Sequence, residues 1–514
     1  MRLNTLLIFW WVLYYISYEA HTLNILGIFP YPGQSHFFAF KRYLEELAIR
    51  GHNVTVISYF PREQVLQNYH DIRLVGNTKV SEKILPRQRS YWQLLTTSLL
   101  LASTGTESCR AMLGDVKVQS LWKSNAQFDI SIVEQFNSDC SLGLAHKLGA
   151  PVVGVNSHAL LPWHYNRFGI SYNPAYVPFP FLESGSTLTF YQRIERTVFN
   201  VYFRFVYKFL CQRVDQNTLA TYFDDVPPLE DLATEIKLLL SYSNFILSGS
   251  NLWPANVIEV GGHHVDTPRE IPKDILKFIE ESEHGIIYIS FGSMLRAASA
   301  PEYIVSTIIS VVSELPQRVL WKWENVTLPG NPKNIMISSW FPQNDILAHP
   351  KTLAFYSHCG ALSITEAIYH AVPIVGMPVF GDQAVNAGFV EKSGLGVQVH
   401  LSELTKEVLL EKFNIVLDKG FRSRVKLLSR AWHDRQTSPM DSAIFWTEFA
   451  ARNKNFTIRS PAVNVPFYQF YNIDVLAFII LFLSLSAFIV GNIFIFLYSK
   501  NSLYGHDLQT KKNK

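Results

Sequence analysis

Short apolar runs alternate with longer amphipathic stretches along most of the chain. In the first half, the strand-length runs are 23–29, 54–59, 128–133 and 151–155, and helical patterns cover 36–50 and the stretch before Leu148. Strands that alternate with helices are typical of a parallel sheet covered by helices on its faces. Residues 160–240 are rich in aromatic side chains and are expected to form helices over this sheet. The pattern predicts one α/β domain over 21–245.

The same alternation starts again at Gly285. The strand-length runs of the second half are 286–293, 318–323, 334–340, 352–358, 372–378 and 396–400, with helical patterns at 302–315, 361–370 and 383–392. Glycine and proline are frequent in 246–272, which is typical of a linker. We therefore expect a second doubly wound α/β domain over 273–460. A ligand is expected in the cleft between the carboxyl edges of the two facing sheets.

The amino-terminal end has the layout of a signal peptide. Arg2 precedes the apolar run Leu6 to Ile16, and polar residues and the small Ala20 follow. The prediction is a cleaved leader over 1–20, with an uncleaved membrane anchor as the alternative. A cleaved leader would place the body outside the cytosol.

The carboxyl-terminal end is predicted to cross a membrane. The run 475–498 carries no formal charge and exceeds the roughly 20 residues that span the hydrocarbon core. Residues 461–474 are the expected juxtamembrane stretch. The tail 499–514 holds four lysines against Asp507, which predicts a cytosolic tail and a single-pass type I topology with a lumenal body. The last residues, Lys511-Lys512-Asn513-Lys514, resemble a dilysine retrieval signal of the endoplasmic reticulum membrane.

Composition excludes several classes of protein. Of the 514 residues, 48% are apolar and 17% are charged, which rules out a disordered chain. The net charge of +3 gives no field for nucleic acid, and no nucleic-acid partner is expected. The four cysteines lack C-x-x-C spacing, which argues against a zinc or iron–sulfur cluster. Three glycosylation sequons, at Asn53, Asn325 and Asn455, are compatible with a lumenal body.

Residues 340–386 carry the strongest chemical pattern. His358 and Gly360 follow a predicted strand and precede a helix that contains Ser363, so free backbone N–H groups and the positive helix end favour a phosphate ligand. Glu366, farther along the helix, can accept hydrogen bonds from ribose hydroxyls. Trp340 offers a stacking face for a base. These features together predict a nucleotide diphosphate site.

Two further residues suit a sugar. Asp382 and Gln383 come shortly after the next predicted strand, where one acceptor-only group and one mixed group can bind hydroxyls.

This segment closely resembles that of the UDP-glycosyltransferases. The matching positions are Trp340, Pro342, Gln343, His358, Gly360, Ser363, Glu366, Pro373, Pro378, Asp382, Gln383 and Asn386. The resemblance extends to 286–294, to the linker 257–265 and to both ends of the chain. Cys359 stands where animal members commonly have glycine, although cysteine resembles the plant form. The chain is thus identified as a member of the superfamily, similar to arthropod membrane-bound glucosyl- and glucuronosyltransferases.

The resemblance implies a GT-B fold, in which two Rossmann-like domains face each other with the acceptor domain first. The donor base would stack on Trp340, Gln343 would contact uracil or ribose, and Glu366 would bind ribose. The diphosphate would be bound by Ser293, His358, Gly360 and Ser363, and the transferred sugar by Asp382 and Gln383. The family needs no metal, so neither a metal nor any cofactor besides the UDP-sugar co-substrate is expected.

His36 is the predicted general base. It follows the first strand and begins a helix, and an imidazole oriented by a carboxylate can remove a phenol or alcohol proton near neutral pH. Two carboxylates can orient it. Glu134 directly follows a predicted strand, where the family places its catalytic carboxylate, and Asp139 lies five residues farther on. Position favours Glu134, and both stay open.

The expected reaction is transfer of a sugar from a UDP-sugar to a small lipophilic acceptor, with inversion at the anomeric carbon. Glucose is preferred because the stretch around Glu134 is closer to that of glucosyl-transferring members. Glucuronate is the alternative sugar. The alternative from another functional class is a lumenal homologue that binds a UDP-sugar or a lipophile without catalysis. Such a binder would not require His36 with a nearby carboxylate, and this difference distinguishes the two functions. Self-association into a homo-oligomer stays open.

Overall fold

A computed structural model describes residues 22–76, 90–182, 188–455 and 458–512. The chain forms two compact units, one up to Ser460 and one over Pro461–Lys514. The expected signal peptide lies outside the described residues.

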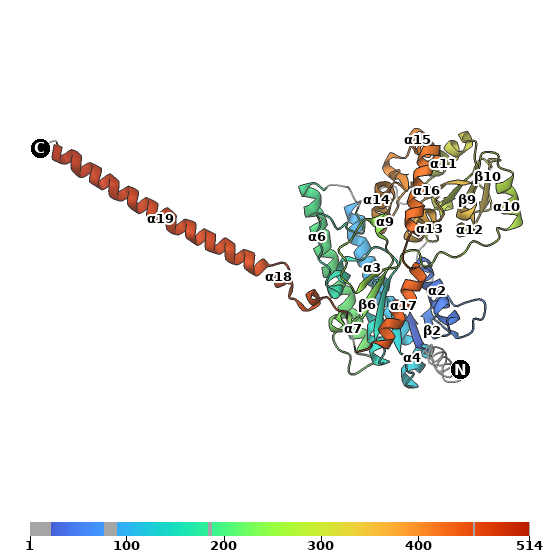
Figure 1. The fold of residues 1–514 in the computed structure, drawn as a ribbon, viewed down its shortest axis with the longest axis horizontal. Helices are drawn as coiled ribbons and strands as arrows, with labels where there is room; N and C mark the ends of the chain where they lie inside the picture. Colours follow the sequence, from blue (N-terminus) through green and yellow to red (C-terminus); the bar gives the residue numbers. More distant parts are fainter. Residues whose placement is uncertain (1–21, 77–89, 183–187, 456–457, 513–514) are drawn as a thin grey trace, which may run out of the picture. The chain divides into compact units, whose positions relative to one another are not determined.

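The first unit begins with a parallel sheet of seven strands in the order β3-β2-β1-β4-β5-β6-β7 (Figure 1). Its strands are β1 (Asn24–Ile28), β2 (Asn53–Ser58), β3 (Tyr69–Arg73), β4 (Ile130–Glu134), β5 (Val152–Asn156), β6 (Leu238–Ser241) and β7 (Val257–Glu259). In β1, Ile25 lies opposite Val54 on one side and Ile130 on the other. Every residue of β4 is buried, as expected for a parallel sheet that is covered on both faces.

The helices around the first sheet follow the expected alternation and include the aromatic-rich stretch. They are α2 (Gln34–Ile49), α3 (Tyr91–Gly114), α4 (Val116–Lys123), α5 (Cys140–Lys147), η1 (Pro162–Phe168), α6 (Phe190–Val206), the π-helical η2 (Tyr207–Gln212), α7 (Arg213–Leu219) and α8 (Leu229–Thr234). The short helix α9 (Phe245–Ser248) instead packs on the second domain, where Leu247 joins the hydrophobic core.

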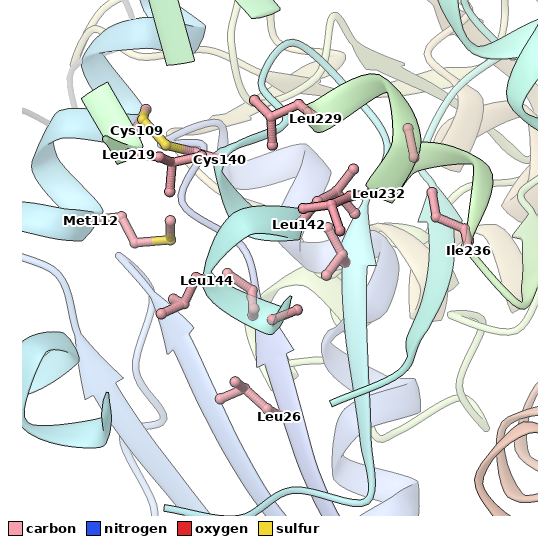
Figure 2. Close-up of a cluster of buried hydrophobic side chains, with 14 of the residues drawn as sticks. Leu26, Cys109, Met112, Cys140, Leu142, Leu144, Leu219, Leu229, Leu232 and Ile236 are labelled. Atoms are coloured by element: carbon pink, nitrogen blue, oxygen red, sulfur yellow. A yellow bond between two sulfur atoms is a disulfide. The ribbon is translucent and has the colours of Figure 1, made fainter. Parts of the chain in front are cut away.

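One hydrophobic core of this domain contains a disulfide bond. Cys109 of α3 and Cys140 of α5 are joined, and leucines of β1, α5, α7 and α8 pack around them (Figure 2). The link fixes α3 to the helix that follows β4. Cys211 and Cys359 are free and buried.

The second sheet has six parallel strands in the order β10-β9-β8-β11-β12-β13. They are β8 (Ile286–Ser290), β9 (Arg318–Lys322), β10 (Ile335–Ser338), β11 (Thr352–Ser357), β12 (Ile374–Gly376) and β13 (Gly396–Gln398). The helices and helical turns of this half are α10 (Lys273–Glu280), η3 (Ala297–Ser299), α11 (Glu302–Glu314), α12 (Gln343–Ala348), α13 (Ala361–Tyr369), α14 (Gln383–Ser393), η4 (Leu401–Glu403), α15 (Lys406–Leu417), α16 (Lys419–His433) and α17 (Pro439–Arg452). Two doubly wound domains were predicted, and the fold confirms them.

The structure departs from the predicted boundaries at two places. β7 falls inside the expected linker 246–272, yet it pairs with β6 as the edge of the first sheet. α17 was expected in the second domain, but Ala443 and Ile444 belong to the core beneath the first sheet and the Tyr43 hydroxyl bonds Thr447. Figure 1 draws α17 beside the first sheet. The apolar face of α17 thus packs on the first domain, although α17 follows the second domain in the sequence. The order of elements along the chain does not reveal such a contact.

The second unit contains η5 (Pro461–Asn464), α18 (Phe467–Phe470) and the long helix α19 (Ile473–Lys512). Within the described residues, Ile473–Lys500 is the one stretch long and apolar enough to cross a membrane, with a mean hydropathy of 2.7. It contains the predicted span 475–498.

The strand order places a topological switch point in each sheet. Connections leave in opposite directions after β1 and β4 in the first sheet, and after β8 and β11 in the second. Doubly wound sheets bind ligands beyond the carboxyl ends of the strands at such points. His36, Glu134, Ser293 and His358 all follow or end these four strands.

Candidate active site

A single cavity of about 1300 Å³ collects most of the predicted site residues. It is lined by His36, Ser293, Trp340, Gln343, His358, Gly360, Ser363, Glu366, Asp382 and Gln383, which come from both domains. Two predicted residues are absent from the lining. Glu134 lies behind His36, and Asp139 lies elsewhere.

His36 is held from behind by two side chains. Its Nδ1 lies 2.7 Å from Oε1 of Glu134, the last residue of β4, and 3.0 Å from Oγ of Ser157, which follows β5. The Ser157 hydroxyl also donates to Glu134 at 2.8 Å. Burial opposes ionisation of Glu134, but the charge of His36 and the hydrogen bonds from His36 and Ser157 lower its pKa. With Nδ1 bound to a carboxylate, the imidazole presents Nε2 as its acceptor nitrogen.

Aromatic rings restrict the imidazole on its other sides. The ring centroids of Tyr31 and Phe136 lie 4.7 Å and 4.3 Å from that of His36. His158 also lines the cavity, and its Nδ1 lies 2.8 Å from the Ala159 carbonyl oxygen. Burial, with the nearby charge of His36, lowers the pKa of His158 to about 4, so this second imidazole is neutral at neutral pH.

Asp139, the alternative partner of His36, does not reach it. Both of its carboxylate oxygens accept from the Arg167 guanidinium, at 2.7 and 2.5 Å, and Gln212 donates to one of them. All three side chains are buried. A buried guanidinium requires a counter-charge, and Asp139 supplies it. This alternative for the catalytic carboxylate is therefore wrong.

The donor side is built on a helix start without a side-chain cap. β11 ends at Ser357, and Gly360 is the N-cap of α13 with no side-chain hydrogen bond to the first turn. Backbone N–H groups thus remain for a ligand in the cavity. Cys359 adopts a φ of 62°, a left-handed conformation that favours glycine.

Two glycines make room for His358. A Cβ atom at Gly292 or at Gly360 would lie 2.5 Å from the His358 Nε2 atom. Burial and the charge of Lys322 lower the pKa of His358 to about 4. The imidazole is therefore neutral, and it can serve an anion as a hydrogen-bond donor but not as a cation.

A polar network surrounds Glu366. The Gln343 amide nitrogen donates to Oγ of Ser363 at 3.1 Å and to Oε2 of Glu366 at 2.5 Å. On the other side, Nε2 of His264 lies 3.6 Å from Oε1 of Glu366. Trp340 is 56% exposed and lines the cavity.

Asp382 and Gln383 begin α14. Burial raises the pKa of Asp382, although Asn386 donates to its Oδ2 at 3.0 Å and the charge of His36 acts in the opposite direction. The side-chain oxygen Oε1 of Gln383 accepts from the backbone N–H groups of Val379 and Phe380. Its amide nitrogen is therefore the atom that can serve a ligand.

The chain matches known glycosyltransferases over nearly its whole length. The family model described as "UDP-glucoronosyl and UDP-glucosyl transferase" matches residues 28–505. The chain belongs to this family. It is a UDP-glycosyltransferase, as the sequence pattern predicted.

Individual relatives are similar over most of their length. The UDP-glycosyltransferase UGT5 of Dactylopius coccus is 33% identical, and the match covers 90% of this chain and 90% of the relative. UDP-glucosyltransferase 2 of the same organism is also 33% identical, and the match covers 91% of this chain and 92% of the relative. The human UDP-glucuronosyltransferase 1A9 is 30% identical over 90% of both chains.

Solved structures show the same fold. A UDP-glucosyltransferase from Polygonum tinctorium has a TM-score of 0.56 at 15% identity and covers 85% of this chain and 100% of its own. The calicheamicin glycosyltransferase CalG4 has a TM-score of 0.54 at 17% identity and covers 84% and 99%. The GT-B fold class is thereby confirmed.

Two groups in the described part of this UDP-glycosyltransferase bring metal-binding atoms together. His36, Glu134 and His158 place such atoms within 4.8 Å of one another, as do Cys109, Cys140 and Asp215. The cysteines of the second group form a disulfide and present no thiolate. In the first group, Nδ1 of His36 and Oε1 of Glu134 already contact each other. Metal-free transfer remains a prediction.

Sequence reasoning missed several cavity residues of this transferase. Ser157 directly follows β5 and lines the cavity. Lys322 ends β9 and also lines the cavity, and its ammonium lies 2.9 Å from Glu324. Both stand at carboxyl ends of strands, so the rule that located His36 also applies to them. Tyr31 and Phe136 also follow strand ends, those of β1 and β4, but an aromatic side chain there gives no chemical signal.

Proposed function

We propose that this UDP-glycosyltransferase transfers glucose from UDP-glucose to a hydroxyl group of a small lipophilic acceptor, with inversion. The observation that carries the proposal is the shared cavity, where His36 with Glu134 and Ser157 behind it faces the uncapped helix start after Gly360. A base and an anion site on opposite sides of one cavity are what a direct displacement requires.

In the proposed reaction, Nε2 of His36 takes the proton of the acceptor hydroxyl. The acceptor oxygen then bonds to the anomeric carbon while the bond from that carbon to the diphosphate oxygen breaks, and UDP leaves. Glu134 stabilises the imidazolium that forms. Attack opposite to the leaving group converts an α-linked donor into a β-glycoside.

On the donor side, uracil would stack on Trp340, and Gln343 and Glu366 would bind the ribose. Ser293, His358, Ser363 and the N–H groups after Gly360 would bind the diphosphate both in the UDP-sugar and in the departing UDP. Asp382 and the amide nitrogen of Gln383 would hold the sugar. No metal is assigned a step, and we expect full activity in EDTA.

Glucose is favoured over glucuronate by the charges near the sugar position. Asp382 presents a carboxyl group there, which would repel a second carboxylate, and the Lys322 ammonium is paired with Glu324. The name of one Dactylopius coccus relative, a UDP-glucosyltransferase, points to the same sugar.

We further propose a type I protein of the endoplasmic reticulum membrane, with its leader 1–20 removed and its tail 499–514 in the cytosol. The Cys109–Cys140 disulfide supports a lumenal body, since disulfides persist in oxidising compartments. Asn325 is exposed and accessible to glycosylation, whereas the Asn53 amide donates to Asn24 at the start of β2.

The test offers membranes containing the full chain UDP-glucose or UDP-glucuronate with a panel of phenols, in the presence and absence of EDTA. The expected product carries a hexose mass increment and a β-anomeric linkage by NMR, with or without EDTA. A hexuronate increment would contradict the sugar assignment. An α-linkage would contradict direct displacement, and loss of activity in EDTA with rescue by a divalent ion would contradict the donor site.

A further inference from the structure

A buried imidazole stands behind the carboxylate that the proposed function assigns to the ribose. Oε2 of this carboxylate, which belongs to Glu366, accepts from the Gln343 amide at 2.5 Å, and its Oε1 lies 3.6 Å from Nε2 of His264. Glu366 and Gln343 line the cavity, whereas His264 does not, and the His264 side chain is only 7% exposed. Two groups of the protein thus contact the carboxylate, one on each of its oxygens.

The segment that carries His264 is fixed against the second domain. It follows β7, and its Gly262 has a φ of 101°, where a Cβ atom would lie 3.2 Å from the Trp432 ring of α16. The Arg435 guanidinium donates to the carbonyl oxygen of Gly261 at 3.1 Å. Because the backbone is held in this way, the position of the imidazole does not depend on a loose loop.

Tyr242 fixes the other ring nitrogen of His264. It directly follows β6 of the first sheet, and its buried hydroxyl lies 2.7 Å from Nδ1 of His264. Burial, together with the nearby charge of Glu366, raises the pKa of Tyr242 well above its ordinary value, although a hydrogen bond with Thr365 acts in the opposite direction. The hydroxyl therefore keeps its proton and can donate it to Nδ1.

This contact decides which nitrogen of the neutral ring carries the hydrogen. When Nδ1 accepts from Tyr242, the N–H group is on Nε2 and faces Glu366. In the other tautomer, a lone pair on Nε2 would face the carboxylate oxygen and repel it. The His264 ring is thus held as a hydrogen-bond donor toward Glu366.

The Nε2 atom of His264 is buried and makes no hydrogen bond in the part of the chain that the structure describes. An unpaired buried N–H costs about 1–3 kcal/mol. The 3.6 Å to Glu366 is only slightly longer than the roughly 2.7–3.2 Å of an N–H···O hydrogen bond. A small movement of the carboxylate toward the ring would satisfy the donor, and this favours one orientation of Glu366.

A carboxylate held in one orientation suits a vicinal diol. Each carboxylate oxygen has two lone pairs, so it can accept from a donor of the protein and from one ribose hydroxyl at the same time. A free glutamate side chain would lose up to about 2 kcal/mol of conformational entropy when a ligand fixes it. Contacts that already hold the side chain reduce this loss on binding.

We propose that His264, backed by Tyr242, is a positioning residue that orients Glu366 toward both ribose hydroxyls and makes the donor site selective for ribonucleotides over dideoxynucleotides. The inference rests on the proposed function, which places the ribose of UDP at Glu366. His264 itself touches neither the nucleotide nor the sugar and acts through Glu366. The first domain takes part in ribose recognition through Tyr242, although the nucleotide site lies in the second domain.

The test is calorimetric binding of UDP and of 2′,3′-dideoxy-UDP, which lacks both hydroxyls, to the full chain in detergent micelles. The decisive pair of variants is His264→Asn and His264→Gln. An asparagine amide can replace Nδ1 beside Tyr242 but is too short to reach Glu366, whereas a glutamine amide nitrogen can replace Nε2.

We expect His264→Asn to weaken the binding of UDP roughly tenfold, a loss of about 1.4 kcal/mol, and to leave that of 2′,3′-dideoxy-UDP unchanged. His264→Gln should keep the preference of the unmodified chain for UDP. Tyr242→Phe should lower that preference about threefold, because the ring can then carry its hydrogen on Nδ1.

The matched control is His263→Asn, at the neighbouring buried histidine. Its Nδ1 lies 2.8 Å from the carbonyl oxygen of Val260. We expect the ratio of the two affinities in this variant to equal that of the unmodified chain, even if the protein is less stable.

Three results would overturn the positioning role. Equal weakening of both nucleotides by His264→Asn would show that His264 supports the fold of the site and not the orientation of Glu366. Unchanged UDP binding in this variant would show that Glu366 needs no such support. An equal loss in His264→Gln and His264→Asn would show that a donor at Nε2 is not required.

The proposed function can fail separately. A chain that prefers UDP over 2′,3′-dideoxy-UDP but transfers no sugar to any phenol would contradict the proposed reaction and leave the role of His264 intact, because the binding measurement needs no turnover. An unmodified chain that binds both nucleotides equally would contradict the placement of ribose at Glu366, and the positioning role would fail with it.

Discussion

The two domains share one strand order and one switch point but present different kinds of groups to the cavity. The first domain contributes side chains, with His36 fixed by Glu134 and Ser157 and enclosed by Tyr31 and Phe136. The second contributes a helix start, and its His358 is neutral and fits between two glycines. In the proposed reaction, one sheet edge would thus provide the proton-transfer group, and the other would provide the anion site.

This difference predicts which kinetic constant should change when residues of each domain are mutated. A side-chain base acts in the transition state, so its loss should lower kcat. A backbone anion site binds UDP in both ground and transition state, so its disturbance should mainly raise the KM of the donor. The predictions below test this division.

The largest effect is expected for His36→Ala. Without a base, the acceptor hydroxyl keeps its proton during attack, and kcat should fall by about 10²- to 10⁴-fold. The affinity for UDP, measured by calorimetry, should stay unchanged. His284→Ala, at an exposed histidine, is the control. A parallel loss of UDP affinity would indicate that His36 is structural and that the halves do not divide the work.

Glu134→Gln should lower kcat by roughly 10²-fold, since the neutral amide no longer stabilises the imidazolium. Asp139→Asn is the informative contrast, because it leaves the buried Arg167 without its counter-charge. That change should cost about 3–5 kcal/mol of unfolding free energy and leave kcat per folded molecule unchanged. Denaturant unfolding and steady-state kinetics on both variants would distinguish these effects. A loss of kcat in Asp139→Asn with a loss of stability in Glu134→Gln would contradict the assignment of Glu134 as the partner of His36.

Most cavity residues of the second domain were predictable because they are contiguous. Trp340 to Gln383 fall within one segment, in which His358 directly follows the end of β11 and Trp340 comes two residues after the end of β10. The residues of the first domain were harder, since His36, Glu134 and Ser157 come from three separate strand ends. The sequence placed Glu134 and Asp139 close to the same strand end, and only the buried Arg167, from η1, shows which one is engaged elsewhere. Long-range packing, as for α17 on the first sheet, leaves no local signal.

Gly360→Ala should affect the donor half alone. The new Cβ atom would lie 2.5 Å from Nε2 of His358 and displace the imidazole from the diphosphate position. We expect the KM for the UDP-sugar to rise about tenfold with little change in kcat, which corresponds to one lost hydrogen bond to a charged group. Gly114→Ala, where a Cβ meets no atom closer than 3.7 Å, is the control. A fall in kcat at unchanged KM would contradict the division.

The smallest expected effect concerns buried histidines, which occur in both halves and in the segment that joins them. His263 does not line the cavity, and burial together with the nearby charge of His264 lowers its pKa to about 4. In the unfolded chain its ordinary value is 6.5. Between these values the unfolded chain binds a proton that the folded chain excludes, so stability falls as the pH drops from 6.5 toward 4.

From pH 6.5 to 5.5, this one group should remove about 1 kcal/mol of unfolding free energy. His263→Gln does not titrate, so its own loss over the same interval should be smaller by that amount, whatever its absolute stability. Urea unfolding followed by tryptophan fluorescence at the two pH values provides the comparison. Identical losses in the variant and the unmodified chain would show that His263 takes up its proton in the folded state, against the lowered pKa.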